Sequence, residues 1–427
     1  MKQLFHTPEG LRDVYGMECE KKIFLQRSLQ KVFHSYGYEN IEPPSLEYFD
    51  VFGKQIGTTS PRELYKFFDR EGNTLALRPD FTPSIARAVS MYFHKEDMPI
   101  RLCYQGSTFV NHSSYRGRLR ESTQMGVELI GDDSVDADGE IIALVVDLLK
   151  SAGLTRFQIS IGQVDFFRAL IRESGMEEET VDQLRQLISN KNYFGVEELL
   201  ESLNLPRHLV EIFAALPTLF GGLDVLEKAK KMTDNPDALK AVSRLEELYN
   251  VVKLYGCEQY ISFDLGMLSK FGYYTGIIFH GYTYGTGEAL VKGGRYDHLL
   301  EQFGEPASAI GFGLIMERLV SALERQNISV PVKRHKSLLL YKEDQRKLAV
   351  DMAQFLRNNM NKVQCMRIDE KEDMKDYLDY AEAHHFVDLI YVESEDEIIT
   401  HPMNDKYGSQ THMPYVLWKG VQHYCNT

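Results

Sequence analysis

The stretch 101–131 constrains the fold most, because its pattern of apolar and polar residues predicts a β-hairpin. A strand-like run ends at about Phe109, a polar turn containing Ser113, Ser114 and Gly117 follows, and a second strand-like run returns. An isolated hairpin is marginally stable in water, so two such strands need other strands or helices to cover their apolar side. The sequence therefore predicts a core built on a sheet in this part of the chain.

The returning strand has two faces of different character. Because side chains alternate between the faces of a strand, Gln124, Gly126 and Glu128 share one face. The opposite face is apolar and carries Met125, Val127 and Leu129. A glycine between an amide and a carboxylate would leave space above the sheet for a ligand that both side chains bind. An ordinary solvent-facing strand has the same pattern, so the pattern alone leaves both interpretations open.

Helical and extended segments flank this hairpin. Apolar residues at helical spacing predict one helix over 17–36, with Gly37 placed to end it, and another over 137–152. The rest of the stretch 75–131 is typical of short strands separated by turns. These segments predict a mixed fold of helices and strands.

The stretch 165–250 is almost purely helical in pattern. It lies between a strand-like run at 157–161 and a strand-rich return over 260–284. We therefore predict a helical insertion between strands of one sheet, within a first domain that spans 1–326.

The segment 327–336 interrupts these patterns with Pro331 and a cluster of basic residues, which is typical of a linker. Beyond it, short apolar runs alternate with helical stretches, and these runs are 338–341, 363–368 and 389–392. This alternation predicts a small α/β domain over 337–427 with a mostly parallel sheet.

Composition narrows the classes of function. The formal charge of −14 makes binding to a long stretch of nucleic acid less expected, because the nucleic acid backbone is itself negatively charged. No apolar run reaches the roughly 18–20 residues that span a bilayer, so we expect a cytoplasmic protein. Neither a disulfide framework nor a zinc site is expected, because the cysteines are odd in number, scattered and without a CxxC pair: Cys19, Cys103, Cys257, Cys365 and Cys425. His384, His385 and Asp388 are poorly spaced for a metal, and we expect none there.

The hairpin resembles, without a gap, motif 2 of class II aminoacyl-tRNA synthetases in its histidyl form. In that motif a strand ends in Phe-Arg-x-Glu, a Gly-Arg loop follows, and the return strand reads Gln-x-Gly-x-Glu, as it does here from Gln124 to Glu128. Further segments match the same family in order, the last of them resembling motif 3: 8–13, 77–82, 273–276, 293–297 and 309–319. The resemblance covers residues 1 to about 325 and, more faintly, the C-terminal domain.

The resemblance implies an α+β fold, in which helices flank an antiparallel sheet, with a dimer contact near 38–48. It also implies a histidine pocket formed by Asp80, Thr82, Gln124, Glu128, Tyr273 and Tyr274. Their chemistry suits the ligand, because the ammonium group of histidine attracts carboxylates and its imidazole bonds acidic or phenolic groups. No metal or other cofactor is implied.

Several residues depart from the family pattern. Val110 stands where the family has an arginine that holds the amino-acid carboxylate and the α-phosphate of ATP, and His112 and Ser114 replace an acid and a proline. The run 269–274 replaces Arg-Gly-Leu-Asp-Tyr-Tyr with Ser-Lys-Phe-Gly-Tyr-Tyr. Because losing one preorganised charge in such a site typically costs about 10²–10³ in rate, we expect no aminoacylation activity.

Three arginines of the family pattern remain, Arg118, Arg120 and Arg318, and they are candidates for contacts to the loop or to phosphate. The alternatives are that Arg318 forms a solvated helix pair with Glu317 and that the loop arginines are surface charges. In the C-terminal domain the stretch 369–382 carries many acids, which disfavours an RNA-binding surface.

A histidine pocket without the activating arginines is typical of a sensor, and the chain resembles the regulatory subunits of short-form ATP phosphoribosyltransferase. That resemblance implies a non-catalytic chain that activates a short catalytic subunit and makes it sensitive to L-histidine, in the first step of histidine biosynthesis. It further implies a homodimer within a hetero-oligomer, a hetero-octamer, without membrane or tRNA as partners. The alternatives are an active histidine–tRNA ligase and a module that senses uncharged tRNA.

Overall fold

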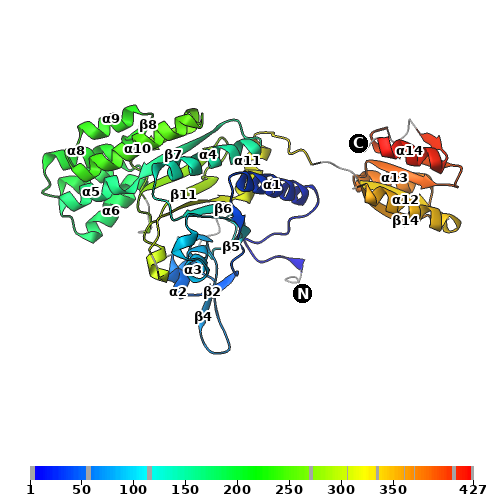
Figure 1. Ribbon diagram of the computed structural model, residues 1–427, viewed down its shortest axis with the longest axis horizontal. Coiled ribbons are helices and arrows are strands. Elements are labelled where there is room, and N and C mark those ends of the chain that lie inside the picture. Colours follow the sequence, from blue (N-terminus) through cyan, green and yellow to red (C-terminus); the bar gives the residue numbers. More distant parts are fainter. Residues whose placement is uncertain are drawn as a thin grey trace. The chain divides into compact units, whose positions relative to one another are not determined.

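The computed structural model describes residues 5–53, 59–112, 118–268, 273–304, 306–332, 336–359, 361–369, 371–405 and 410–424. The chain forms two compact units, Met1–Val330 and Pro331–Thr427 (Figure 1). The predicted turn residues Ser113, Ser114 and Gly117, the residues 269–272 and the basic residues 333–335 lie outside the described ranges.

Unit 1 is built on a nine-stranded sheet in the order β1-β5-β6-β12-β11-β10-β7-β9-β8. Its strands are β1 (Glu39–Asn40), β5 (Ile100–Phe109), β6 (Glu121–Ile130), β7 (Phe157–Gln163), β8 (Phe220–Gly221), β9 (Ile261–Asp264), β10 (Ile277–Thr283), β11 (Val291–Arg295) and β12 (Ala309–Ile315). The sheet is antiparallel from β5 to β7, as predicted. Parallel pairs β1–β5 and β7–β9 near its two ends make the whole sheet mixed, which the sequence did not predict.

The predicted hairpin is formed by β5 and β6, which pair along their full lengths from Ile100 opposite Ile130 to Phe109 opposite Glu121. The apolar face of β6 is buried in a core that it shares with α1 (Gly16–Ser35) and α4 (Val135–Ser151). This confirms the predicted hairpin and the two predicted helices. The polar face of β6 is also buried, so the interpretation as a solvent-facing strand is wrong.

A helix that the sequence pattern did not predict follows the small loop at 78–81. This helix, α3 (Thr82–Tyr92), lies within the stretch where we predicted only strands and turns. Pro83 lies in its first turn, where the missing N–H of proline costs nothing, although in a sequence the same proline is typical of a break. Ile85 and Val89, one turn apart, are fully buried and fix the helix to the sheet.

The helical insertion is confirmed, because β7 precedes it and both β9 and β10, which follow it, pair with β7. Its helices are α5 (Val164–Ser174), α6 (Glu178–Ser189), α7 (Tyr193–Glu201), α8 (Arg207–Ala215), α9 (Asp224–Lys231) and α10 (Pro236–Leu254). Figure 1 shows this block in green at one end of unit 1. The two-residue strand β8 interrupts it, which we did not predict.

A second, three-stranded sheet of unit 1 has the order β2-β4-β3, with β2 (Leu46–Tyr48), β3 (Lys66–Phe68) and β4 (Thr74–Leu77). The register places on one face five apolar side chains that we call the apolar face: Leu46, Tyr48, Phe67, Leu75 and Leu77. Tyr48 is 60% exposed and Phe67 is 44% exposed. The opposite face buries Glu47, which pairs with Arg87 of α3 at 2.7 Å.

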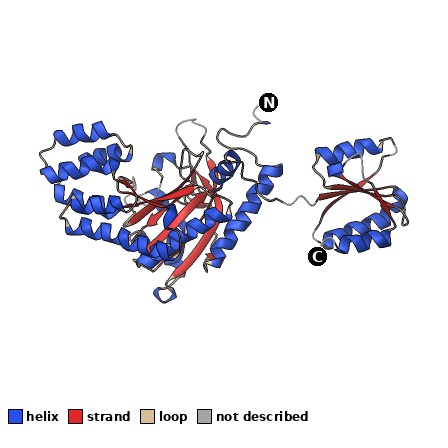
Figure 2. Ribbon diagram, turned by 90° about the horizontal axis from the view of Figure 1, so that it is seen from above, coloured by secondary structure: helices blue, strands red, loops and turns tan. Residues whose placement is uncertain are grey.

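Unit 2 has a five-stranded sheet in the order β14-β13-β15-β16-β17. One core contains α12 (Arg346–Asn358) and α14 (Tyr415–Tyr424), and another contains α13 (Met374–Ala383). Figure 2 shows helices on both faces of this sheet. Its strands are β13 (Lys336–Tyr341), β14 (Lys362–Arg367), β15 (Asp388–Val392), β16 (Ile398–Pro402) and β17 (Thr411–Met413). The three predicted strands form the parallel part. The prediction of a mostly parallel sheet is wrong, because β16 and β17 add antiparallel pairs.

Candidate functional site

A cleft of about 1110 Å³ opens over the sheet of unit 1. Its wall includes residues of β6, of the loop before α3, of strands β10 to β12 and of α11 (Met316–Arg325). Every residue predicted to bind histidine lines it except Glu128, and the three candidate arginines line it too. The fold therefore brings together side chains that lie far apart in the sequence.

Asp80 stands in the wall of the cleft at the start of α3. Its Oδ1 accepts the backbone N–H of Phe81 at 2.7 Å and the amide of Gln124 at 3.1 Å. Gln124 also donates to the hydroxyl of Tyr104 at 3.2 Å. These bonds fix the carboxylate beside the cleft, where it can receive an ammonium group.

The space above Gly126 is filled by the protein itself. A Cβ at this position would lie 2.4 Å from the hydroxyl oxygen of Tyr104 and 2.1 Å from the carbonyl oxygen of Phe312. Tyr104 donates to that carbonyl at 3.3 Å and stacks on Phe81 with ring centroids 4.4 Å apart. Our prediction that Gly126 leaves room for a ligand is therefore wrong, because the room serves a buried tyrosine of the neighbouring strand.

Glu128 lies beneath the cleft and is 1% exposed. One of its oxygens accepts the hydroxyl of Thr82 at 2.7 Å and the other accepts that of Tyr296 at 2.5 Å. Burial raises the pKa of Glu128 to about 8, against the lowering effect of these two hydrogen bonds. The carboxyl group is therefore mostly protonated at neutral pH and holds Thr82 and Tyr296 in place, and its contact with histidine stays a prediction.

This protonation makes the stability of unit 1 depend on pH. The folded state keeps the proton of Glu128 up to about pH 8, whereas the unfolded chain loses it near the ordinary value of 4.5. The stability that Glu128 contributes is complete below pH 4.5 and is lost as the pH rises through 8. Relative to Glu128→Gln, the wild type should therefore lose up to about 1.4 kcal/mol of unfolding free energy per pH unit. Urea unfolding of both proteins between pH 5 and 8 measures this difference, and a constant difference would contradict it.

Tyr273 and Tyr274 also line the cleft. Their rings stack with centroids 4.3 Å apart, and their hydroxyls share a hydrogen bond. Burial raises the pKa of both phenols above the usual value, so both stay neutral. A neutral phenol can donate to or accept from an imidazole nitrogen. The residues before them, including Ser269 and Lys270, lie outside the described residues.

Two of the three retained arginines, Arg118 and Arg318, meet at one carboxylate in the cleft. Arg318 forms a close ion pair with Glu288, and Arg118 reaches the same carboxylate at 3.4 Å. Glu317 instead pairs with Lys22 at 2.8 Å. The alternative that Arg318 pairs with Glu317 is therefore wrong.

Val110 and Arg120 lie side by side at the mouth of the hairpin, and both line the cleft. The N–H of Val110 donates to the carbonyl of Arg120 at 2.9 Å, and the N–H of Arg120 donates to the carbonyl of Gly10 at 2.8 Å. An isopropyl group therefore occupies the position at which the family pattern has a guanidinium.

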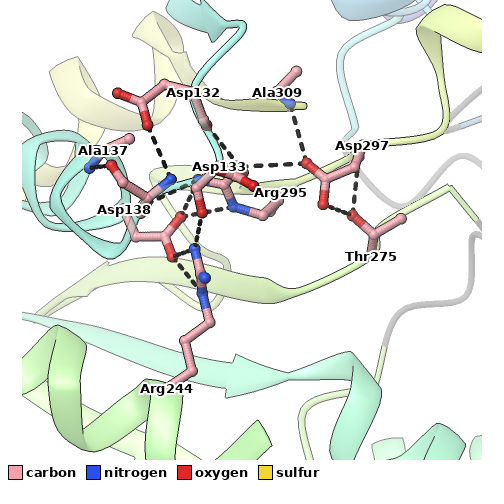
Figure 3. A network of polar contacts seen from close by, with 10 residues as sticks. Asp132, Asp133, Ala137, Asp138, Arg244, Thr275, Arg295, Asp297 and Ala309 are labelled. Atoms are coloured by element: carbon pink, nitrogen blue, oxygen red, sulfur yellow. Dashed lines mark hydrogen bonds and ion pairs between the residues drawn. The ribbon is translucent and has the colours of Figure 1, made fainter. Parts of the chain in front are cut away.

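A buried ionic network supports the end of β11 (Figure 3). Asp138 of α4 is fully buried between two arginines, and Arg295 donates to its Oδ1 at 2.9 and 2.6 Å while Arg244 donates to its Oδ2 at the same distances. Asp297 accepts the hydroxyl of Thr275 at 2.8 Å, next to Tyr274. The network thus holds the end of β11, directly before Tyr296, and the segment that carries Tyr273 and Tyr274. In the sequence, the run 293–297 matches the family pattern but does not indicate this network.

Two classes of site find no support in the described part of the chain. There, no group of three or more His, Cys, Asp or Glu side chains could hold a metal ion. None of the described helices is both long enough and apolar enough to cross a membrane.

Comparison with known proteins identifies the family. The family model for histidyl-tRNA synthetase matches residues 10–319. The ATP phosphoribosyltransferase regulatory subunit of Acetivibrio thermocellus is 39% identical over 352 residues, which cover 82% of this chain and 84% of that protein. The protein of the same name from Ruminiclostridium cellulolyticum is 36% identical over 412 residues and covers 96% of this chain and 98% of its own length.

Solved structures agree with the sequence relatives. An ATP phosphoribosyltransferase regulatory subunit/histidyl-tRNA synthetase from Bacillus halodurans is 34% identical, with a TM-score of 0.82 over 91% of this chain and 98% of that one. Histidyl-tRNA synthetase from Nostoc, 18% identical, has a TM-score of 0.80 over 98% of this chain and 99% of its own, which shows the shared fold alone. The predicted class II synthetase-like fold is confirmed, and the chain belongs to the family of ATP phosphoribosyltransferase regulatory subunits.

Proposed function

We propose that this chain is the non-catalytic regulatory subunit of a cytoplasmic ATP phosphoribosyltransferase. It activates a separate short catalytic subunit and makes that subunit sensitive to inhibition by L-histidine, in the first step of histidine biosynthesis. The names of the sequence relatives support the partnership with a catalytic subunit. The cleft of unit 1 supports the binding of histidine.

One observation carries the proposal: the cleft contains the fixed carboxylate of Asp80 and two neutral phenols, and it also contains the uncharged Val110. Asp80 suits the ammonium of free histidine, and Tyr273 and Tyr274 suit its imidazole. Val110 cannot neutralise the charge that develops at the α-phosphate during activation. Such a cleft holds histidine without activating it, so we infer that aminoacylation is absent.

Regulation needs only that histidine bind an inhibited state of the complex better than an active state, and such coupling is typically about 1–3 kcal/mol. We expect the purified chain to raise the rate at which a short-form catalytic subunit produces phosphoribosyl-ATP, and histidine to lower that rate again. An unchanged rate with insensitivity to histidine would refute the proposal. Histidine-dependent pyrophosphate exchange by the chain alone would favour the alternative, an active histidine–tRNA ligase.

We further propose that the chain forms a homodimer within a hetero-octamer. The apolar face of the small sheet supports this, because its exposed side chains adjoin the segment 38–48 where the family resemblance implies the dimer contact. Sedimentation of the mixed complex gives its stoichiometry directly.

A further inference from the structure

Three segments that are distant in the sequence meet at one carboxylate in the cleft. Glu288 lies in the connection between β10 and β11, Arg118 comes just before β6, and Arg318 belongs to α11. One oxygen of Glu288 faces Nη2 of Arg118 at 3.4 Å, and the other forms the close ion pair with Nη2 of Arg318. Nη1 of Arg318 donates to the carbonyl of Ala289 at 2.8 Å, which holds the guanidinium beside Glu288.

Within the described ranges, Glu288 is the one carboxylate in ion-pair distance of either guanidinium. Its side chain is 45% exposed, so it lies in the wall of the cleft in contact with solvent. Lys292, Arg118 and Arg318 line the same cleft. With Arg120 and Arg325, which also line it, these cations outnumber the carboxylates of the cleft, Asp80, Glu288 and Glu317.

Clustered cations in a concave site attract polyanions, and arginine in particular forms paired hydrogen bonds with phosphate. Here the carboxylate of Glu288 already pairs with both arginines. A phosphate that binds the Nη2 groups of these arginines competes with Glu288 for them, and the carboxylate then lies close to the incoming negative charge. Like charges held close in a recognition site cost enough to exclude a ligand.

We propose that Glu288 is a specificity-determining residue, a built-in anion that excludes phosphate-bearing ligands from the cleft and leaves it to an amino acid. The inference rests on the proposed histidine cleft for the occupant that remains. On this proposal, two features oppose the binding of a nucleotide. Val110 replaces the arginine of motif 2, and the carboxylate of Glu288 neutralises Arg118 and Arg318.

The test is direct binding of ATP and of inorganic triphosphate to the chain alone, measured by calorimetry for the wild type and for Glu288→Ala. We expect Glu288→Ala to bind both ligands at least about tenfold more tightly than the wild type. The gain should disappear when Arg318→Ala is added, and it should shrink with rising salt. Equal affinities in wild type and variant would overturn the proposal, as would a gain for ATP without one for triphosphate.

A matched control distinguishes the effect of removing this particular carboxylate from the effect of removing one negative charge anywhere on the protein. Glu211 on α8 is also exposed and also pairs with an arginine, Arg207, but it lies outside the cleft. Glu211→Ala should leave both affinities unchanged, and an equal gain there would contradict the proposal. Thermal melting checks that each variant is folded. Because neither histidine nor a catalytic subunit is present, failure here would leave the regulatory function standing.

Discussion

Replacement of Asp138 by alanine should lower the free energy of unfolding of unit 1 by about 3–5 kcal/mol. The carboxylate is fully buried, and the Arg295 side chain that it neutralises is 4% exposed. Its removal leaves that guanidinium in the core without the partner that accepts two of its hydrogen bonds. Losing one member of a buried ion pair costs far more than losing a surface pair, because the remaining charge cannot regain water.

The single tryptophan gives this experiment an internal reference. Trp418 is buried in the core of unit 2, so its fluorescence during urea unfolding reports on that unit, whereas far-ultraviolet circular dichroism is dominated by unit 1. We expect Asp138→Ala to shift the dichroism transition and to leave the fluorescence transition in place. Asp237→Ala is the surface control, because Asp237 and Arg172 are both more than 60% exposed, and it should cost about 0–1 kcal/mol. A similar small loss for Asp138→Ala would show that the network contributes little.

Replacement of Asp80 by asparagine should weaken the binding of histidine by about 100-fold or more, because it removes the charge that we propose to face the ammonium group. Asparagine keeps an oxygen that can accept the N–H of Phe81, so the local backbone should be retained. Calorimetry on the purified chain measures the affinity. In the complex, the histidine concentration that halves the rate should rise by a similar factor.

An analogue without the amino group sharpens this test. Imidazole propionate should bind the wild type and Asp80→Asn with nearly equal affinity, because the interaction that the variant removes is absent from the ligand. Asp224→Asn, a change at an exposed pair on α9, should leave histidine binding unaltered. Equal histidine affinities for the wild type and Asp80→Asn would place the amino acid elsewhere.

The local parts of the fold were predictable because their signals are local. The alternation in 121–130 gave the strand and its apolar face, and helical spacing gave α1 and α4. Helix α3 was not predicted, because a proline such as Pro83 is typical of the end of a helix and because the apolar stripe of this helix is short. Strands β16 and β17 of unit 2 were not predicted, because they are short and their apolar and polar residues do not alternate clearly.

The candidate site was predictable only in part, for a different physical reason. The family pattern names Asp80 and Gln124, and the structure brings them together by hydrogen bonding. No pattern within β6 could show that Tyr104 of the neighbouring strand fills the space above Gly126. Likewise Glu288 lies in a glycine-rich turn, and only the fold shows that Arg318 of α11 pairs with it. These features depend on contacts between distant segments, which a linear pattern does not encode.

The insertion between β7 and β9 sets the order in which the chain can assemble during synthesis. The bond from Tyr104 to Phe312 spans 208 residues, and β6 gains its second neighbour only when β12 has been made. Until then the nascent hairpin presents an unpaired edge beside a largely apolar face. Non-local strand pairing of this kind is slow, and its intermediates are prone to aggregate. Truncated products that end before β12 should therefore depend most on chaperones.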